Sequence, residues 1–251
     1  MSIERSERES LILARLAREG SLTVASLSKQ LGVSEVTIRT DLRTLEDQGL
    51  LARTHGGAEA TGYRNVLERQ LQHSAEKERI AAAAADLVHD NDVIMIEAGT
   101  TCAEIVAHLG SRRGVQILTN STLVLRHARL YPSLTVVLTG GTFNRASESL
   151  VGPGALAALE AFNVRLAFFG TDGFSAGRGL TTAFAEGAEV IRAMRARSAE
   201  SWLVADSSKY GKAGFVSVMD LADLTGVITD SALAPESQSE LSNSGLDVRY
   251  V

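Results

Sequence analysis

Glycine, hydroxyl and amide residues follow directly after short apolar segments in the C-terminal two thirds of the chain. The clusters are Gly99, Thr100 and Thr101 after 93–96, Asn120 and Ser121 after 115–118, and Gly140 and Gly141 after 134–138. Glycine lets the backbone approach a ligand, and free backbone N–H and hydroxyl groups donate hydrogen bonds to an anion. Because a helical segment begins at the first cluster, its unpaired N–H groups face the same point. This chemistry suits a phosphate group.

Two charged residues extend this set. Asp172 follows the apolar run 164–169, and Lys209 follows 201–205. A carboxylate accepts hydrogen bonds from sugar hydroxyls, and a lysine ammonium pairs with a phosphate as a point charge. Each residue has an alternative role, because an aspartate before a glycine suits a turn and a loop lysine is commonly solvated. Each glycine or hydroxyl cluster taken alone is also typical of an ordinary turn, but the shared placement favours a common pocket.

These residues depend on a sheet for their placement. Apolar runs of four to six residues occur at 93–96, 115–118, 134–138, 164–169, 201–205 and 226–229. The distances between them leave room for one crossover helix each, which is typical of a mostly parallel sheet covered on both faces. The carboxyl ends of parallel strands meet at one edge, where ligands bind. The sequence therefore predicts an α/β domain over 76–251 with its polar clusters at one edge.

The first fifty residues have a different pattern, with three short helical segments and no strand pattern. Apolar residues at helical spacing are Ile12, Leu13 and Leu16, then Val24, Leu27 and Leu31, then Ile38, Leu42 and Leu45. Thr23 and Ser34 suit helix N-caps. The predicted helix ends are Gly20, Gly32 and Gly49. A helix, a tight turn at 31–34 and a second helix match the helix-turn-helix plan.

The third helical segment is the one that reads DNA in this plan. With its apolar residues toward the core, a step of about 100° per residue leaves a polar opposite face. That face carries Val36, Thr37, Thr40, Arg43 and Thr44, with Arg39 at its edge. Arginine and hydroxyl groups contact phosphates and base edges, and valine suits a thymine methyl. Residues 50–57 predict a small hairpin, or wing, with Arg53 and His55 near the DNA backbone. From periodicity alone, a three-helix bundle with a polar face explains this segment equally well.

Composition limits the possible functions. The net charge is −5, and residues 1–60 hold eight Lys and Arg against nine Asp and Glu, which argues mildly against nucleic-acid binding. Hydrophobic residues make up 45 %, enough for a core, without an apolar stretch long enough to span a membrane. The N-terminus lacks an apolar signal segment, so we expect a cytoplasmic protein. One cysteine, Cys102, and five scattered histidines predict no disulfide, no metal site and no cofactor.

The segment TIRTDLRTLEDQGLLARTHGGA at 37–58 resembles the signature of the DeoR family of sugar-metabolism repressors. Further segments similar to the family follow in order, namely ERQLQHSAEKERIA at 68–81, EAGTT at 97–101, TNS at 119–121, TGG at 139–141, GTDGF at 170–174 and DSSKYG at 206–211. Six such segments behind a matching helix-turn-helix are highly specific and cover nearly the whole chain. The sequence departs from the family at Thr40, where a second arginine is expected, and at Glu97, where aspartate is usual.

The resemblance implies a small winged helix-turn-helix domain at 1–57, a linker at 58–75 and a sugar-phosphate-sensing domain at 76–251 similar to ribose-5-phosphate isomerase. It implies a repressor of carbohydrate-metabolism genes that binds double-stranded operator DNA as a homodimer or homotetramer and is controlled by a phosphorylated sugar. The implied DNA-binding residues are Val36, Thr37, Arg39, Thr40, Arg43, Thr44, Arg53 and His55. The implied effector-binding residues are Gly99, Thr100, Thr101, Asn120, Ser121, Gly140, Gly141, Asp172 and Lys209.

Two other functions stay open from the residues of the larger domain alone. An isomerase or deaminase acting on a sugar phosphate needs a carboxylate base, and Asp172 and Glu97 are candidates. A sugar-phosphate-binding module that does not bind DNA is the second alternative. The helix-turn-helix disfavours both, because neither has a use for a DNA reader.

Overall fold

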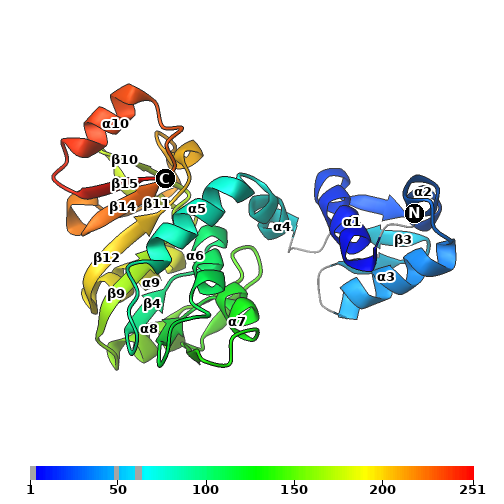
Figure 1. Cartoon of the computed structure of the whole chain (residues 1–251), viewed down its shortest axis with the longest axis horizontal. Helices are drawn as coiled ribbons and strands as arrows, with labels where there is room; N and C mark the ends of the chain where they lie inside the picture. The colour runs from blue at the N-terminus through cyan, green and yellow to red at the C-terminus, as the bar shows by residue number, and fades with distance from the viewer. Residues whose placement is uncertain (1–3, 48–50, 60–63) are drawn as a thin grey trace. The chain divides into compact units, whose positions relative to one another are not determined.

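The structure is a computed structural model that describes residues 4–47, 51–59 and 64–251. Two compact units make up the chain, Met1–Gln72 and His73–Val251 (Figure 1). The first unit contains α1 (Arg5–Glu19), β1 (Ser21–Thr23), α2 (Val24–Leu31), α3 (Glu35–Asp47), β2 (Ala52–Thr54), β3 (Gly57–Glu59) and α4 (Arg64–Leu71). No helix within the described ranges is long and apolar enough to cross a membrane.

Capping residues set the boundaries of α2 and α3. The Thr23 hydroxyl accepts a hydrogen bond from the Ser26 backbone N–H at 3.2 Å, and Ser34 Oγ accepts one from the Thr37 N–H at 3.1 Å. Gly32 ends α2 in the left-handed conformation, with a φ of 67°. These three predictions are confirmed, whereas the helix end predicted at Gly49 lies outside the described residues. The turn between the two helices is short, as the helix-turn-helix plan requires.

Helices α1, α2 and α3 share one hydrophobic core. The helical residues in it are Ile12, Leu16, Val24, Leu27, Ile38, Leu42 and Leu45, none more than 5 % exposed. Leu13 and Leu31 pack at its margin. The predicted core positions are confirmed, because apolar residues spaced three and four apart fall on one side of a helix. Burial of this side of α3 leaves its opposite face to solvent.

A small antiparallel sheet, with the strand order β1–β3–β2, completes the described part of this unit. Strands β2 and β3 form the predicted wing. The prediction of no strand in the first fifty residues is wrong, because β1 pairs with β3 and places Leu22 opposite Ala58. A three-residue strand is too short to show an alternating pattern, and β1 depends on β3 for its hydrogen bonds. At Gly57 the two strands meet so closely that a Cβ would lie 1.8 Å from the Leu22 carbonyl oxygen.

The range expected as a linker, 58–75, contains regular structure. Helix α4 occupies Arg64–Leu71 of it, and α5 begins at Ser74, two residues before the predicted start at Glu76. Helix α4 packs against α1 and buries Val66 completely. The glycines around this range suggest a free connection, but the packing of α4 shows that part of it belongs to the first unit. His73 has a φ of 53°, a left-handed conformation that separates α4 from α5.

The second unit is built on a parallel sheet. Its helices and strands are α5 (Ser74–Ala85), β4 (Val93–Ile96), α6 (Thr100–Ile105), β5 (Gln116–Thr119), α7 (Thr122–Ala128), β6 (Thr135–Leu138), β7 (Thr142–Asn144), β8 (Ser149–Val151), α8 (Pro153–Glu160), β9 (Val164–Phe169), β10 (Gly173–Ser175), β11 (Gly179–Thr182), α9 (Ala185–Ala196), β12 (Ser198–Val204), β13 (Val216–Met219), β14 (Gly226–Thr229), α10 (Pro235–Ser242) and β15 (Asp247–Tyr250), with short 3-10 turns at Val106–His108, Ser207–Lys209 and Leu221–Asp223. The predicted strands at 93–96, 164–169 and 226–229 are confirmed, and the other three shift by one to three residues at their ends.

The strand order of the described sheet is β15–β14–β12–β9–β4–β5–β6, and every neighbouring pair is parallel. From β4 the chain moves outward through β5 to β6, and from β9 it moves outward through β12 to the opposite edge. The connections that leave β4 and β9 therefore diverge. In open α/β sheets, ligands bind at the carboxyl ends of two strands related in this way.

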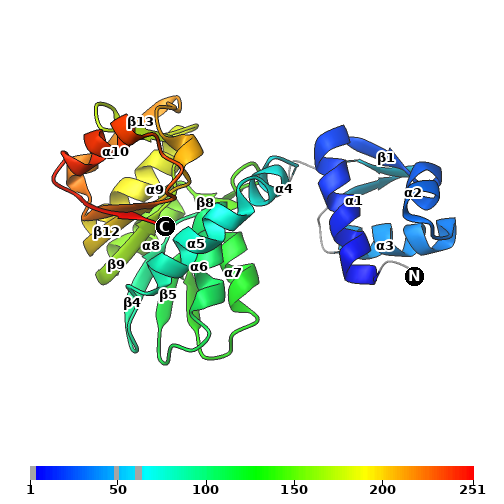
Figure 2. The same ribbon diagram turned by 45° about the horizontal axis from the view of Figure 1, so that its top comes forward.

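Helices cover both faces of this sheet (Figure 2). Helices α5, α6 and α7 lie side by side on one face, and α8 and α9 pack together on the other. Successive strand residues serve opposite faces, so Met95 and Phe169 join the cluster that includes Met194 of α9, while Ile94 and Phe168 are buried on the other face. Burial on both sides explains why these strands are continuous apolar runs rather than alternating ones.

Several short strands were not predicted from the sequence. Strands β7 and β8 form a hairpin, and β10, β11 and β13 form a small antiparallel sheet. Strand β15 adds a parallel edge beside β14. Each has only three or four residues, too few for an apolar period to be recognised. Near the β15 edge, Trp202 of β12 is 2 % exposed and the guanidinium of Arg249 lies 4.7 Å from the centre of its ring.

Replacing Gly57 with alanine is expected to disrupt the wing. The added Cβ would lie 1.8 Å from the Leu22 carbonyl oxygen, so β1 and β3 cannot keep their pairing. Amide hydrogen exchange at 21–23 and 57–59, followed by mass spectrometry, should accelerate about tenfold or more, which corresponds to a loss of at least about 1.4 kcal/mol. Gly56→Ala is the matched control, because its added Cβ meets nothing within 4 Å. Equal acceleration in the two variants would contradict this account.

Candidate nucleic-acid interface and ligand site

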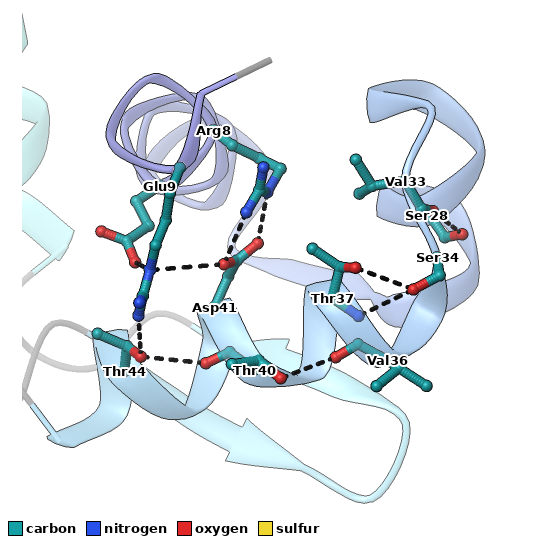
Figure 3. Close-up of polar contacts among 11 residues, drawn as sticks. Arg8, Glu9, Ser28, Val33, Ser34, Val36, Thr37, Thr40, Asp41 and Thr44 are labelled. Carbon is teal, nitrogen blue, oxygen red and sulfur yellow. Dashed lines mark hydrogen bonds and ion pairs between the residues drawn. The ribbon is translucent and has the colours of Figure 1, made fainter. Parts of the chain in front are cut away.

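A buried ion pair between α1 and α3 positions the candidate reading helix, α3. Arg8 donates from Nε to Asp41 Oδ2 at 2.6 Å and from Nη2 to Oδ1 at 3.0 Å (Figure 3). Arg8 is 7 % exposed and Asp41 only 1 %. The hydrogen bond that Arg8 donates to Asp41 raises the pKa of Arg8 despite the opposing effect of burial. This two-point contact satisfies both charges and holds α3 in one rotation against α1.

Three threonine hydroxyls on α3 make hydrogen bonds within the first unit (Figure 3). Thr40 Oγ1 donates to the Val36 carbonyl at 3.0 Å, and Thr44 Oγ1 donates to the Thr40 carbonyl at 3.2 Å. Thr44 Oγ1 also accepts a hydrogen bond from Arg5 Nη2 at 2.6 Å. Thr37 Oγ1 lies 2.9 Å from Ser34 Oγ, so it belongs to the helix cap. The Thr40 and Thr44 hydroxyls would have to exchange partners to donate a hydrogen bond to DNA.

The predicted DNA-reading residues of α3 share one side of the helix. Val36 is 69 % exposed, Arg39, Thr40 and Arg43 are also exposed, and Thr37 and Thr44 are half-buried. Arg39 Nη2 donates to Glu35 Oε2 at 2.7 Å. The helix geometry used for the prediction thus brings the side chains together, but Thr37 and Thr44 lie nearer the core than the arginines.

Arg53 and His55 lie on the wing, and both are exposed. The Arg53 backbone N–H donates to Glu46 Oε1 at 3.0 Å, and its guanidinium lies 3.6 Å from Glu46 Oε2. Glu46 therefore ties β2 to the last turns of α3. His55 lies in the hairpin turn that follows β2. The wing and α3 form one connected element through Glu46.

In the second unit, the candidate ligand site lies where β4 and β9 end. A Cβ added at Gly99 would lie 3.9 Å from Gly170 Cα, so the two loops are in close contact. Glu97 directly follows β4, is 7 % exposed and accepts a hydrogen bond from the Gly170 N–H at 3.3 Å. Thr100 begins α6 and Thr101 is 7 % exposed. Because α6 has only six residues, its dipole is small, and loop N–H and hydroxyl groups would provide most of the attraction for an anion.

Asn120 and Ser121 are buried, and their side chains hold neighbouring backbone. Asn120 Oδ1 accepts from the Ala98 N–H at 3.0 Å, and Nδ2 donates to the Leu150 carbonyl at 3.3 Å. Ser121 Oγ accepts from the Val124 N–H at 3.2 Å and caps α7. Both residues are no more than 1 % exposed. They position the loop after β4 and the start of α7, and a ligand would not reach their side chains without a rearrangement.

Gly140 and Gly141 make a left-handed turn after β6, with φ values of 71° and 107°. A Cβ on Gly141 would lie 2.6 Å from the Val151 carbonyl oxygen, so the turn packs closely against β8. No other residue type adopts this turn without strain. The pair leaves exposed backbone at the edge of the sheet.

Asp172 is half-buried and its carboxylate is engaged locally. Its Oδ2 accepts hydrogen bonds from the Ala183 N–H at 2.8 Å and from Thr182 Oγ1 at 3.2 Å. These contacts link the loop after β9 to the end of β11. They give Asp172 a structural role at the base of the β10–β11 hairpin and engage one of its two carboxylate oxygens.

Two buried aspartates hold the turn that carries Lys209. Asp206 is 2 % exposed and accepts from the Ser208 N–H at 3.2 Å. Asp230 is fully buried after β14 and accepts from the Ser207 N–H at 2.6 Å. Lys209 is half-buried, and within the described ranges its ammonium makes no hydrogen bond or ion pair. Asp230 was not predicted from the sequence, although it directly follows the apolar run 226–229. A polar residue after an apolar run is the same signal that identified the other loops.

The strand order brings the candidate effector residues into one line. Along the carboxyl edge, the loops after β12, β9, β4, β5 and β6 are neighbours. In that order they carry Lys209, Asp172, then Gly99, Thr100 and Thr101, then Asn120 and Ser121, then Gly140 and Gly141. The only charged residue of this set without a local partner in the described structure is Lys209.

Neither a reactive thiol nor a metal cluster accompanies these loops. Cys102 is fully buried, and burial raises the pKa of its thiol well above the ordinary value, as expected of a core residue. In the ranges that the structure describes, no three His, Cys, Asp or Glu side chains come together in a way that could hold a metal ion.

Known proteins resemble both units. Residues 8–62 match the family described as "DeoR-like helix-turn-helix domain", and residues 72–231 match "DeoR C terminal sensor domain". The chain is 34 % identical to "HTH-type transcriptional regulator GlpR" of Haloferax volcanii, over 97 % of this chain and 96 % of that protein. It is 30 % identical to "Putative aga operon transcriptional repressor" of Escherichia coli O157:H7, over 98 % and 94 %. Ribose 5-phosphate isomerase A of Methanocaldococcus jannaschii is 21 % identical over 55 % of each chain with a TM-score of 0.41, a likeness too low to support a conclusion.

Removing Asp41 is expected to unfold the first unit at a lower temperature. Asp41→Ala removes the carboxylate that accepts two hydrogen bonds from the buried Arg8 guanidinium, and breaking a buried ion pair typically costs about 3–5 kcal/mol. Far-UV circular dichroism of the full chain should then show a separate loss of helix on heating, at a lower temperature than in the wild type. Glu35→Ala is the control, because the pair of Glu35 with Arg39, at 2.7 Å, is on the surface and contributes about 0.5 kcal/mol at most. Indistinguishable melting curves for the two variants would exclude a stabilising role for the buried pair.

The Asp230 carboxylate is expected to make the second unit sensitive to acid. Burial raises the pKa of Asp230, but hydrogen bonds from Ser207 and Ala232 outweigh it and hold the pKa below its ordinary value. A lowered folded-state pKa adds stability above the unfolded value, about 3.9, and this stability is lost as pH falls through the folded pKa. The difference in urea midpoint between wild type and Asp230→Asn should therefore be large at pH 7 and shrink below about pH 4. Glu236→Gln, on an exposed position of α10, should show no such difference at any pH.

Proposed function

The chain belongs to the DeoR family of transcriptional regulators, and from this premise we propose that it represses genes of carbohydrate metabolism and releases its operator when a phosphorylated sugar binds to the C-terminal unit. Its relatives carry the names of regulators and repressors, so the family membership favours regulation over catalysis. The enzyme alternative has less support, because the Asp172 carboxylate is engaged with Ala183 and Thr182.

The exposed side of α3 supports DNA binding in the major groove. It presents two arginines, Arg39 and Arg43, beside the apolar Val36, and the wing adds Arg53 and His55. Because the net charge of this unit is near zero, its affinity for DNA must come from the placement of a few cationic side chains rather than from a large positive field. The buried Arg8–Asp41 pair supports the same conclusion, because a fixed helix loses less conformational freedom when it docks.

The Lys209 loop is the observation that carries the effector proposal. Lys209 is half-buried and its ammonium has no local partner in the described structure, although two buried aspartates hold the turn on which it lies. A lysine on a fixed turn next to β9, one of the two diverging strands, suits the phosphate of a small ligand. The hydroxyls of Thr100 and Thr101 and the backbone at Gly99, Gly140 and Gly141 would complete the contacts. Asn120, Ser121 and Asp172 would act by holding these loops in place.

Release of the operator requires more than one copy of the chain. A single reading helix covers only a few base pairs, so we expect a homodimer or homotetramer that binds a repeated operator. A ligand that changes how the subunits sit would alter the spacing of the reading helices. By linkage, operator DNA must then weaken effector binding by the same factor by which effector weakens operator binding.

Fluorescence anisotropy of labelled duplexes tests both parts of the proposal. Full-length protein should bind a fragment from upstream of its own gene or of neighbouring genes tightly and with strong salt dependence, and one member of a sugar-phosphate panel should reverse the binding. Lys209→Ala should keep its DNA affinity but need roughly 10- to 100-fold more effector, because it loses a charged hydrogen bond. Lys212→Ala, an exposed lysine three residues further on, should respond like wild type.

The possible failures of this experiment have different meanings. No binding to any fragment at low salt would overturn the DNA-reading part. Normal effector response in Lys209→Ala would remove Lys209 from the site. Loss of operator binding in that variant would instead assign the residue a structural role.

A further inference from the structure

Glu35 and Arg39 form an exposed ion pair at the end of α3 that enters the groove in helix-turn-helix proteins. Glu35 is the first residue of α3, and Arg39 lies one turn later. Their atoms Oε2 and Nη2 are 2.7 Å apart, with 46 % of the Glu35 side chain and 56 % of the Arg39 side chain exposed. Val36, the most exposed apolar residue of this helix, lies directly beside them in the sequence. The pair therefore belongs to the surface on which base edges would be read.

Asp41 and Glu46 of the same helix make tertiary contacts that Glu35 lacks. Asp41 is buried against Arg8, and Glu46 accepts a hydrogen bond from the Arg53 backbone on the wing. Within the described structure, the Glu35 carboxylate contacts only the exposed Arg39. An exposed pair one turn apart contributes little to stability in water. Neither the core nor the wing thus requires a carboxylate at this position.

A carboxylate at the groove end of a reading helix disfavours DNA binding unless it finds a hydrogen-bond donor. The donors in the major groove are the amino groups of cytosine and adenine, and acidic side chains characteristically accept from cytosine N4. Arginine binds the O6 and N7 acceptors of guanine with two hydrogen bonds. Side chains one turn apart on a helix are about 5–6 Å apart at Cβ, which lets them reach the same base pair or adjacent pairs.

We propose that Glu35 and Arg39 together select a cytosine–guanine pair, or two adjacent pairs, in each operator half-site. Glu35 accepts from cytosine N4, and Arg39 donates to guanine O6 and N7. On binding, the two side chains exchange their mutual ion pair for base contacts. The proposal rests on the DNA binding described above and adds a base preference to it. It also gives Glu35 a role as a specificity determinant.

Selection from a random duplex library, followed by sequencing of the bound fraction, tests this proposal with the full-length protein. Wild type should favour cytosine at one position of each half-site by about tenfold or more. Glu35→Ala should lose that preference and keep the others, and it should bind unrelated DNA more tightly because a negative charge is gone. Arg39→Ala should lose the guanine preference at the same or the adjacent base pair. Glu7→Ala, an exposed acid in the first turn of α1, is the control and should select the wild-type sequence.

The results separate this inference from the function on which it rests. If wild type selects no sequence, DNA reading itself fails. If wild type selects a sequence and Glu35→Ala selects the same one with equal strength, the role of Glu35 is overturned while DNA reading stands. If Glu35→Ala and Arg39→Ala affect positions more than one base pair apart, the two residues do not act as a unit and the proposal is also overturned.

Discussion

The parallel sheet of the C-terminal unit leaves little room for polar side chains except at the ends of its strands, because helices cover both of its faces. Residues such as Ile94, Phe168 and Met95 are fully buried on its two sides. Parallel strands also place all their carboxyl ends at one edge. These two constraints explain why Glu97, Asp206 and Asp230 are all buried directly after strands, and why the groups suited to a ligand gather there.

At that edge, the polar residues divide into those that build loops and those that face outward. Asn120, Ser121 and Asp230 are buried and bonded to backbone N–H groups, which removes the cost of placing polar groups away from water. The first unit follows the same rule on a smaller scale, since Asp41 lies in its core only because Arg8 matches both of its oxygens. In both units, buried polar contacts set the geometry, and half-buried or exposed residues such as Lys209 remain for partners.

Local patterns in the sequence were sufficient for much of this arrangement. Thr23 and Gly32 fix the start and the end of α2 through contacts within a few residues. The run 164–169 forms a strand because its apolar residues suit burial on both sides of the sheet. Features that depend on distant partners were not predictable in this way. Strand β1 needs β3, and Arg8 needs Asp41, 33 residues away. For the candidate site, the sequence located the loops, but residue type alone could not separate a buried positioning amide such as Asn120 from an outward ligand contact.

Trp202 is the only tryptophan of the chain, and it lies within the sheet of the C-terminal unit. Its ring is packed beneath Arg249, and its indole N–H has no hydrogen-bond partner in the described structure. Intrinsic fluorescence excited at the red edge of the protein absorption band is therefore a signal from one unit alone. It reports directly on the edge of the sheet formed by β12, β14 and β15. The chain thus carries a built-in optical label for its C-terminal unit.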